Sequence, residues 1–256
     1  MILSLSRKKI GIIYILVATF LVSCGSSEKV VYFQNAKDFE TIVDTDTFTP
    51  KFKINDIVSI YVSTFNLDAV RPFNLLKGGA ETRNSEPVDY LVDIDGNIDY
   101  PVLGKIKLLG LTVEEAKNLI KEKLSEGYLK DPIVNIRILN FRISVLGQVN
   151  RPGRYDISGE RISLLEAIAM AGDLAIKGKR KNVLVIRDFN GTKTYTRIDL
   201  TNKELFNSPV YYLTQNDIVY VEPNKSAIST AFLDSRSSIA ISIASILITS
   251  AIVLLR

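Results

Sequence analysis

The sequence carries an uncharged apolar segment near each of its two ends, and these segments confine any soluble domain to the middle of the 256 residues. The N-terminal segment, residues 10–22, follows the basic residues Arg7, Lys8 and Lys9. It would span roughly 20 Å as a helix at ~1.5 Å per residue, which is short of the ~30 Å of a bilayer's hydrocarbon core. This order is typical of a secretory signal. We expect residues 1–23 to be a signal peptide.

The C-terminal segment is long enough to cross a membrane. Residues 237–255 contain no charge, glycine or proline and would span about 28 Å as a helix. Four hydroxylated residues fall on one face of that helix: Ser238, Ser242, Ser245 and Thr249. The stripe predicts helix association or a pore lining, because small hydroxylated residues let helices approach closely. Alternatively, these hydroxyls bond to carbonyls of their own helix.

The single cysteine, Cys24, directly follows the signal segment. The preceding Leu-Val-Ser at 21–23 resembles the lipobox of bacterial lipoproteins, in which the cysteine is lipidated on sulfur and becomes the mature N-terminus. The resemblance implies a lipid anchor on Cys24, and the alternative is a secreted protein with a leftover thiol. Residues 24–49 are mostly polar with scattered aromatics. We expect them to form a tether followed by a docking segment.

Composition narrows the classes of function. The chain has no histidine and no tryptophan, and its formal net charge is +4, so imidazole chemistry and a strong field of one sign are absent. Glycoside hydrolysis by carboxylates alone needs no histidine, but no acidic pair stands in a suggestive context. We therefore expect no enzyme, no catalytic residue, no cofactor and no metal.

One acidic run needs separate treatment. Asp93, Asp95, Asn97 and Asp99 surround Gly96, but the glycine and the final ligand are misplaced for a calcium loop. Asp95-Gly96-Asn97 predicts instead a hairpin turn between strands at 88–94 and 98–102, because Asp-Gly accepts the positive φ of a tight turn.

The first half of the folded part reads as a small α+β domain. A β-branched run at 57–63 and the alternating residues 133–139 predict strands. Between them Thr112 and Glu115 have the spacing of a capping box, and Ala116, Leu119, Ile120 and Leu124 supply a buried helical stripe. Residues 66–87 show no period and are expected to be a long loop.

The second half repeats this pattern. Ser163 and Glu166 form another capping box, Asn216-Asp217-Ile218-Val219 echoes Asn55-Asp56-Ile57-Val58, and residues 145–149 echo 102–106. Strands are predicted at 182–187, 193–198, 210–213 and 218–221, with a turn at Asn190-Gly191. Lys177, Lys179, Arg180 and Lys181 form a basic cluster, expected to be a solvated loop, with contact to an acidic glycan or lipid phosphate as the alternative.

The motifs and their order resemble the Wza-like outer-membrane polysaccharide export proteins. VDIDGNI at 92–98, YPVLG at 100–104 and GLT at 110–112 resemble the polysaccharide export domain of that family. VLGQVNRPGRY at 145–155 and residues 165–172 resemble its soluble-ligand-binding β-grasp (SLBB) domain. The resemblance covers residues 52–223 in the right order.

The fold expected on these grounds is α+β, with two small β-grasp-like periplasmic domains in series, an N-terminal lipid anchor and one C-terminal transmembrane helix. The expected parts are the signal peptide, the tether and docking segment 24–49, the export domain 50–140, the SLBB domain 141–223, a linker 224–235 and the transmembrane helix 236–256.

The resemblance implies a ring of copies at the outer membrane that conducts polysaccharide passively. The partners it implies are the polysaccharide, outer-membrane lipid, other copies of the chain and an inner-membrane copolymerase that resembles a tyrosine kinase. No nucleic acid is expected, because a secreted lipoprotein meets no genome. The alternative is a lipid-anchored periplasmic glycan-binding or scaffold protein without a pore.

Overall fold

The computed structural model describes residues 30–37, 49–77, 86–189 and 191–233, together with 239, 241–243, 245–246 and 250. Two separate hydrophobic cores lie within this part of the chain. One is drawn from residues between Phe52 and Ile136, and the other from residues between Phe141 and Val221. The chain therefore forms two mixed α/β domains in series, as the sequence predicted.

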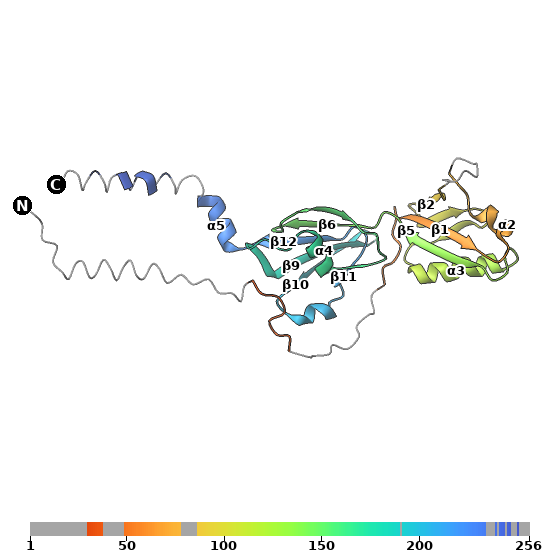
Figure 1. Ribbon diagram of the computed structural model, residues 1–256, viewed down its shortest axis with the longest axis horizontal. Helices are drawn as coiled ribbons and strands as arrows, with labels where there is room; N and C mark the ends of the chain where they lie inside the picture. The colour runs from red at the N-terminus through yellow and green to blue at the C-terminus, as the bar shows by residue number, and fades with distance from the viewer. Residues whose placement is uncertain are drawn as a thin grey trace, which may run out of the picture. The chain divides into compact units, whose positions relative to one another are not determined.

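The first domain is built on an antiparallel sheet with the order β2-β1-β5 (Figure 1). Its strands are β1 (Ile57–Ser63), β2 (Asp89–Leu91) and β5 (Ile133–Ile138). Val58, Ile60 and Val62 are buried while the residues between them are not, because successive side chains of a strand point to opposite faces. A separate hairpin pairs β3 (Asn97–Tyr100) with β4 (Gly104–Lys107).

Helix α3 (Val113–Ser125) covers the inner face of this sheet and buries Ala116, Ile120 and Leu124. It begins with the predicted capping box. The Thr112 hydroxyl accepts from the Glu115 backbone N–H at 3.2 Å, and the Glu115 carboxylate accepts from the Thr112 N–H at 2.7 Å. The capping box is thus confirmed, and it satisfies two N–H groups that the helix itself leaves without partners.

The structure differs from the sequence prediction in two places of the first domain. The turn at 95–97 forms, with Gly96 at φ +80°, but β2 pairs with β1 and β3 pairs with β4, so the expected hairpin across it is wrong. The expected loop at 66–87 contains α2 (Leu67–Val70) and the 3-10 helix η2 (Arg71–Phe73). Asn66 caps α2. The helix was missed because the prediction relied on hydrophobic periodicity, which four residues are too short to show.

The second domain has a five-stranded mixed sheet with the order β10-β9-β12-β6-β7 (Figure 1). Its strands are β6 (Arg142–Gly147), β7 (Gly153–Asp156), β9 (Gly178–Phe189), β10 (Thr192–Ile198) and β12 (Ile218–Pro223). Strands β6 and β12 are parallel, and the other pairs are antiparallel. This central parallel pair is compatible with the β-grasp expected here, whereas the antiparallel sheet of the first domain has no such pair among the described residues.

The remaining elements of the second domain lie against this sheet. Helix α4 (Leu164–Met170) starts at the second predicted capping box, Ser163 and Glu166, which is also confirmed. The short strands β8 (Ile162–Ser163) and β11 (Tyr212–Leu213) pair with each other, and η3 (Lys203–Asn207) precedes β11. The internal echo in the sequence therefore reflects shared caps and turns, not a shared strand order.

The region after the second domain is helical where it is described. The expected linker at 224–235 contains α5 (Lys225–Leu233), which starts where the Asn224 side chain accepts from the Ala227 N–H at 2.9 Å. Most of residues 236–256 lie outside the described residues. Within the described part of the chain, no helix combines the length and the apolar character that crossing a membrane requires.

Candidate functional site

The N-terminal residues 32–35, which we call the docking segment, bind along the second domain although the first domain follows them in sequence. Phe33 and Gln34 donate backbone hydrogen bonds to the carbonyls of Leu200 and Thr201, at 3.3 and 2.7 Å. The Phe33 ring stacks on Phe206 with centroids 5.5 Å apart, and Asn35 exchanges hydrogen bonds with Asn202 and Lys203. These contacts attach the docking segment to the second domain.

Tyr32 completes the docking segment and explains part of the basic cluster. Its hydroxyl donates to Asp173, and burial together with this hydrogen bond raises the pKa of the phenol. The buried Arg180 guanidinium lies over the Tyr32 ring at 5.7 Å from its centroid. Arg180 therefore stabilises the docking segment through a cation–π contact with Tyr32.

The basic cluster is not the solvated loop that the sequence predicted, because β9 begins at Gly178 and runs through it. Lys179 pairs with Glu222 at 2.9 Å, and Lys177 donates to Thr230. Hydrogen bonds from Arg197 and Lys179 lower the pKa of Glu222 to about 2. Two of the four cations, Lys179 and Arg180, are thus engaged within the second domain, which weakens the alternative of a glycan or phosphate site.

Two turns of the same sequence pattern meet where the two domains join, and together with Asn140 we call them the joint. They are residues 53–56 and 214–217, and Asn55 and Asn216 adopt positive φ values of 68° and 65°. In each turn the aspartate accepts the backbone N–H three residues earlier at 2.8 Å. The repeated sequence pattern at 55–58 and 216–219 therefore corresponds to a repeated turn in the structure.

Lys53 connects the two turns of the joint. Its ammonium donates to the Asp188 carbonyl at 2.9 Å, the Thr214 hydroxyl at 3.0 Å and the Gln215 carbonyl at 2.8 Å. Burial lowers the pKa of Lys53. Asn140 lies between the turns, where it donates to the Asn55 carbonyl and accepts from the Gln215 amide.

The two aspartates of the joint differ in their charge environment. Asp217 is fully buried and pairs with Arg187 at 2.7 Å. Asp56 is equally buried but has one oxygen, Oδ1, without a hydrogen-bond partner within the described residues. Burial raises the pKa of Asp56 to about 6.

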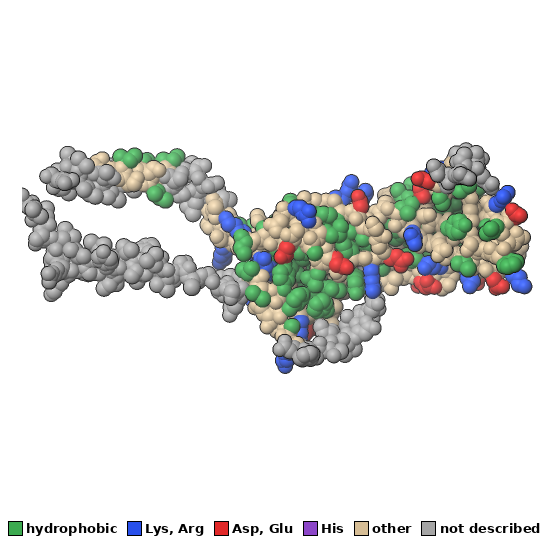
Figure 2. Space-filling view, viewed as in Figure 1, with side chains coloured by type: hydrophobic (Ala, Val, Ile, Leu, Met, Phe, Trp, Pro, Cys, Tyr) green, Lys and Arg blue, Asp and Glu red, His purple; other side chains and the backbone are tan. Residues whose placement is uncertain are grey.

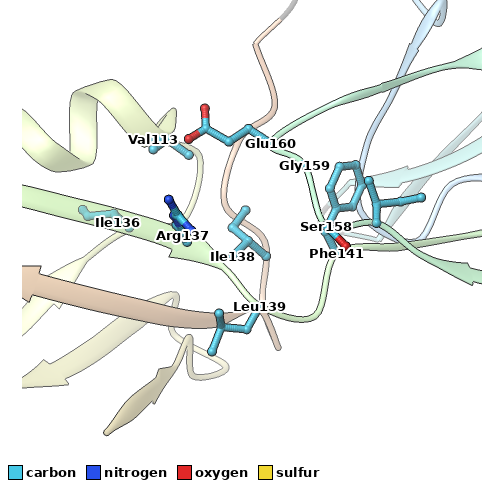
Figure 3. Close-up of a pocket in the computed structure, with 10 residues that line it drawn as sticks. Val113, Ile136, Arg137, Ile138, Leu139, Phe141, Ser158, Gly159 and Glu160 are labelled. Atoms are coloured by element: carbon cyan, nitrogen blue, oxygen red, sulfur yellow. The ribbon is translucent and has the colours of Figure 1, made fainter. Parts of the chain in front are cut away.

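A pocket of about 370 Å³ lies beside the joint (Figure 3). Strand β5 and the residues after it form one side, and residues 157–160 form the other. Its apolar lining includes Ile138, Phe141 and Ile157. The Arg137 guanidinium and the Glu160 carboxylate project into the space, and neither side chain has a hydrogen bond or ion pair within the described residues.

The residues singled out from the sequence fall mostly outside the described part of the chain. Cys24, Ser238 and Thr249 lie outside it. Ser242 and Ser245 are helical and exposed, and the Ser245 hydroxyl donates to the Ser242 carbonyl at 2.8 Å. This bond is of the kind expected under the alternative, in which the hydroxyls bond to carbonyls of their own helix. The acceptor lies three residues earlier. A role in association or pore lining stays a prediction.

Sequence reasoning missed the groups that hold the joint and line the pocket. Lys53 and Arg187 cannot be distinguished from surface cations in the sequence. The repeated Asn-Asp pattern at 55–56 and 216–217 was the sequence signal near the joint. No cluster of three or more metal-binding side chains occurs among the residues that the structure describes. On the face shown in Figure 2, Lys and Arg alternate with Asp and Glu without a large patch of one sign.

Comparison with known proteins identifies both domains. Residues 48–139 match the family model described as polysaccharide biosynthesis/export protein, and residues 142–221 match the SLBB domain model. Together these matches cover about two thirds of the chain and follow the two hydrophobic cores in order.

Two curated relatives carry the same name, EPS I polysaccharide export outer membrane protein EpsA. The protein from Ralstonia solanacearum is 30% identical over 142 residues, which cover 54% of this chain and 37% of the relative. The protein from Ralstonia nicotianae is 34% identical over 91 residues, which cover 33% and 23%. The matched region thus spans well under half of either relative. Their name agrees with the outer-membrane location expected from the sequence.

The tandem order of the two matched models coincides with the order of the two folded domains. The chain therefore belongs to the polysaccharide biosynthesis/export protein family, which is an export family and not a family of enzymes.

Proposed function

We propose that this protein is a subunit of an outer-membrane polysaccharide exporter, in which several copies enclose the path of the polymer. The observation that carries the proposal is the export domain followed directly by an SLBB domain, both folded around their own cores. The two relatives are named as outer-membrane export proteins of an exopolysaccharide. Conduction of this kind needs no nucleophile and no shifted proton donor, since lumen width and hydrogen-bonding groups select the polymer.

We further propose that both membrane attachments lie beside the second domain. The docking segment binds this domain, and α5 leaves it directly after β12. Tyr32 lies eight positions after Cys24, and at roughly 3.6 Å per extended residue this distance is no more than about 29 Å. An acyl chain on Cys24 therefore keeps the second domain close to the membrane, and a transmembrane helix at 236–256 fits the same arrangement.

The remaining parts of the proposal are the ring, the β-grasp character of the domains and the inner-membrane copolymerase that supplies energy. They rest on the family resemblance and on the strand order of the second domain. The proposal gives the domains no chemical step, and their task is to hold the copies around the polymer.

The decisive experiment combines export and assembly. Deleting the gene should abolish polysaccharide at the cell surface, and the intact gene should restore it. Particles of the full chain extracted in mild detergent should be closed rings when imaged by electron microscopy. A stable monomer would support instead a lipid-anchored glycan-binding or scaffold protein, and unchanged surface polysaccharide would reject export altogether.

The lipid anchor is tested separately. Cells grown with labelled palmitate should label the wild-type chain and leave Cys24→Ser unlabelled. Label that persists in Cys24→Ser would contradict anchoring at this residue.

A further inference from the structure

A second pocket, in the first domain, contains the most exposed aromatic side chain of the described residues. It has a volume of about 490 Å³ and lies between the segment after β1 and the segment between α3 and β5. Phe65 on one side is fully exposed, and Tyr128 on the other is 54% exposed. The pocket therefore offers two accessible aromatic rings, a lining that is common in ligand sites.

The pocket is held in shape by contacts around it. The Thr64 hydroxyl donates to the Lys130 carbonyl at 3.0 Å, which ties the two sides together. The Tyr128 ring packs edge-on against Phe73 with centroids 5.9 Å apart. The buried Leu129 forms part of the floor. The aromatic surface of Tyr128 is therefore in place before any ligand binds.

Polar groups stand beside the aromatic rings with unused hydrogen-bonding capacity. The Asn66 side-chain oxygen caps α2, and its amide N–H groups have no hydrogen-bond partner among the residues that the structure describes. The Asp131 carboxylate and the Lys130 ammonium form no hydrogen bond or ion pair within the described residues. Asp131 also adopts a positive φ of 48°, a conformation that costs energy in a residue other than glycine.

This combination fits a sugar better than a protein partner. A pyranose ring presents C–H groups on its face, which pack on aromatic rings, and hydroxyls on its rim, which pair with carboxylates and amides. Ligand pockets commonly enclose about 300–1,000 Å³, a range that includes this one. Protein interfaces need about 800 Å² on each partner and a core depleted of charge, whereas the charged residues Lys130 and Asp131 line this pocket.

We propose that this pocket binds pyranose residues of the exported polymer, with Phe65 and Tyr128 against the sugar ring and Asn66 and Asp131 on its hydroxyls. The proposal rests on the proposed export function and adds to it a defined contact with the polymer in the first domain. The site binds and guides, and it performs no reaction.

The absence of tryptophan from the chain provides a direct test. Phe65→Trp places the chain's single tryptophan in the pocket of the full chain in detergent, and excitation near the red edge of its absorption avoids the tyrosines. The probe is a set of short oligosaccharides obtained by partial acid hydrolysis of the surface polysaccharide of the bacterium that makes the protein. The emission should change and saturate as oligosaccharide is added. Tyr195→Trp, at an exposed position on β10, is the matched control and should not respond.

Two further variants connect the signal to the pocket. Adding Tyr128→Ala to Phe65→Trp should raise the apparent Kd about tenfold, the effect expected from loss of one stacked ring. Adding Asp131→Asn should weaken binding as well, because the amide replaces one acceptor oxygen by a donor. Asp131 is exposed, whereas Tyr128 also contacts the buried Phe73. Circular dichroism and thermal unfolding should show that each variant keeps its fold.

The outcomes separate this inference from the proposed function. If gene deletion abolishes surface polysaccharide while Phe65→Trp gives no saturable response, export stands and the sugar pocket is wrong. The pocket is also wrong if Phe65→Ala removes a co-purifying inner-membrane protein without changing oligosaccharide binding. If deletion leaves surface polysaccharide unchanged, the export function itself fails.

Discussion

Asp56 gives a quantitative test of the electrostatics of the joint. Its folded-state pKa of about 6 compares with 3.8 for an unperturbed carboxyl group. A difference of about two pKa units, at about 1.4 kcal/mol per unit, corresponds to at most about 3 kcal/mol. The cause is burial of a carboxylate whose one hydrogen bond, from the Lys53 N–H, offsets only part of the lost hydration.

The sign of the pH dependence follows from the raised pKa. Below about pH 4 the carboxyl group is protonated in both states, and its contribution to stability is fully present. As the pH rises, the unfolded chain ionises first, so this stability is lost through the interval up to about pH 6. Asp56→Asn cannot ionise and keeps an acceptor for the Lys53 N–H. It should therefore be more stable than wild type at pH 7, with the difference shrinking toward pH 4.

Asp217→Asn is the matched control. Asp217 occupies the same position in the other turn of the joint, but its carboxylate pairs with a cation, Arg187. Asp217 accepts hydrogen bonds from Arg187, and the guanidinium is itself only 14% exposed. Asp217→Asn removes the negative charge that faces Arg187, while the hydrogen bonds from Arg187 to the Pro209 and Tyr212 carbonyls remain. The loss of the ion pair should cost about 3–5 kcal/mol.

The assay must report on each domain separately, since a two-domain chain need not unfold in one transition. Hydrogen exchange of the full chain in urea, measured on peptides from β1 and from β12, gives an opening free energy for each. A loss of stability in Asp56→Asn at pH 7, or a gain that does not change between pH 7 and pH 4, would refute the reasoning.

The other predictions concern caps, the docking segment and the joint. Thr112→Ala should destabilise the first domain by about 1 kcal/mol, because it removes one half of the capping box, while the second domain keeps its stability; urea unfolding followed by hydrogen exchange checks this. Phe33→Ala should release the docking segment from Phe206 and speed limited proteolysis before residue 49, and an unchanged rate would mean that the backbone bonds suffice. Lys53→Met removes three hydrogen bonds between the domains and should broaden the interdomain distances measured with spin labels, whereas Lys107→Met, on β4, should leave them unchanged.

Local chemistry explains what could be predicted from the sequence. The capping boxes at Thr112 and Ser163 and the turns at Asn55 and Asn216 each depend on residues within a few positions, so their patterns are visible directly. The strand at 57–63 was predicted with its observed bounds, because its β-branched run contrasts with polar neighbours on both sides.

Long-range pairing explains what could not be predicted. Strand β2 pairs with β1, about 30 residues earlier, instead of with the strand across the adjacent Asp-Gly turn. Lys179, Arg180 and Lys181 lie in β9, where Arg180 packs against the Tyr32 ring and Lys179 pairs with Glu222, partners that lie far away in sequence. Phe65 and Tyr128 carry no motif at all, and only the fold brings them to one pocket.

The joint also determines how force would pass through the molecule. The docking segment and α5 both attach to the second domain, so any pull from a lipid anchor or a C-terminal membrane helix acts first on that domain. The first domain connects to it through the chain at Asn140 and through the hydrogen bonds of Lys53 and Gln215. Ile138, which packs against both apolar cores, adds a small apolar contact. Because each domain has a much larger apolar core of its own, the joint should yield before either domain unfolds. With the membrane attachments proposed above, polymer that pushes on the first domain would tilt it at the joint and leave the second domain in place.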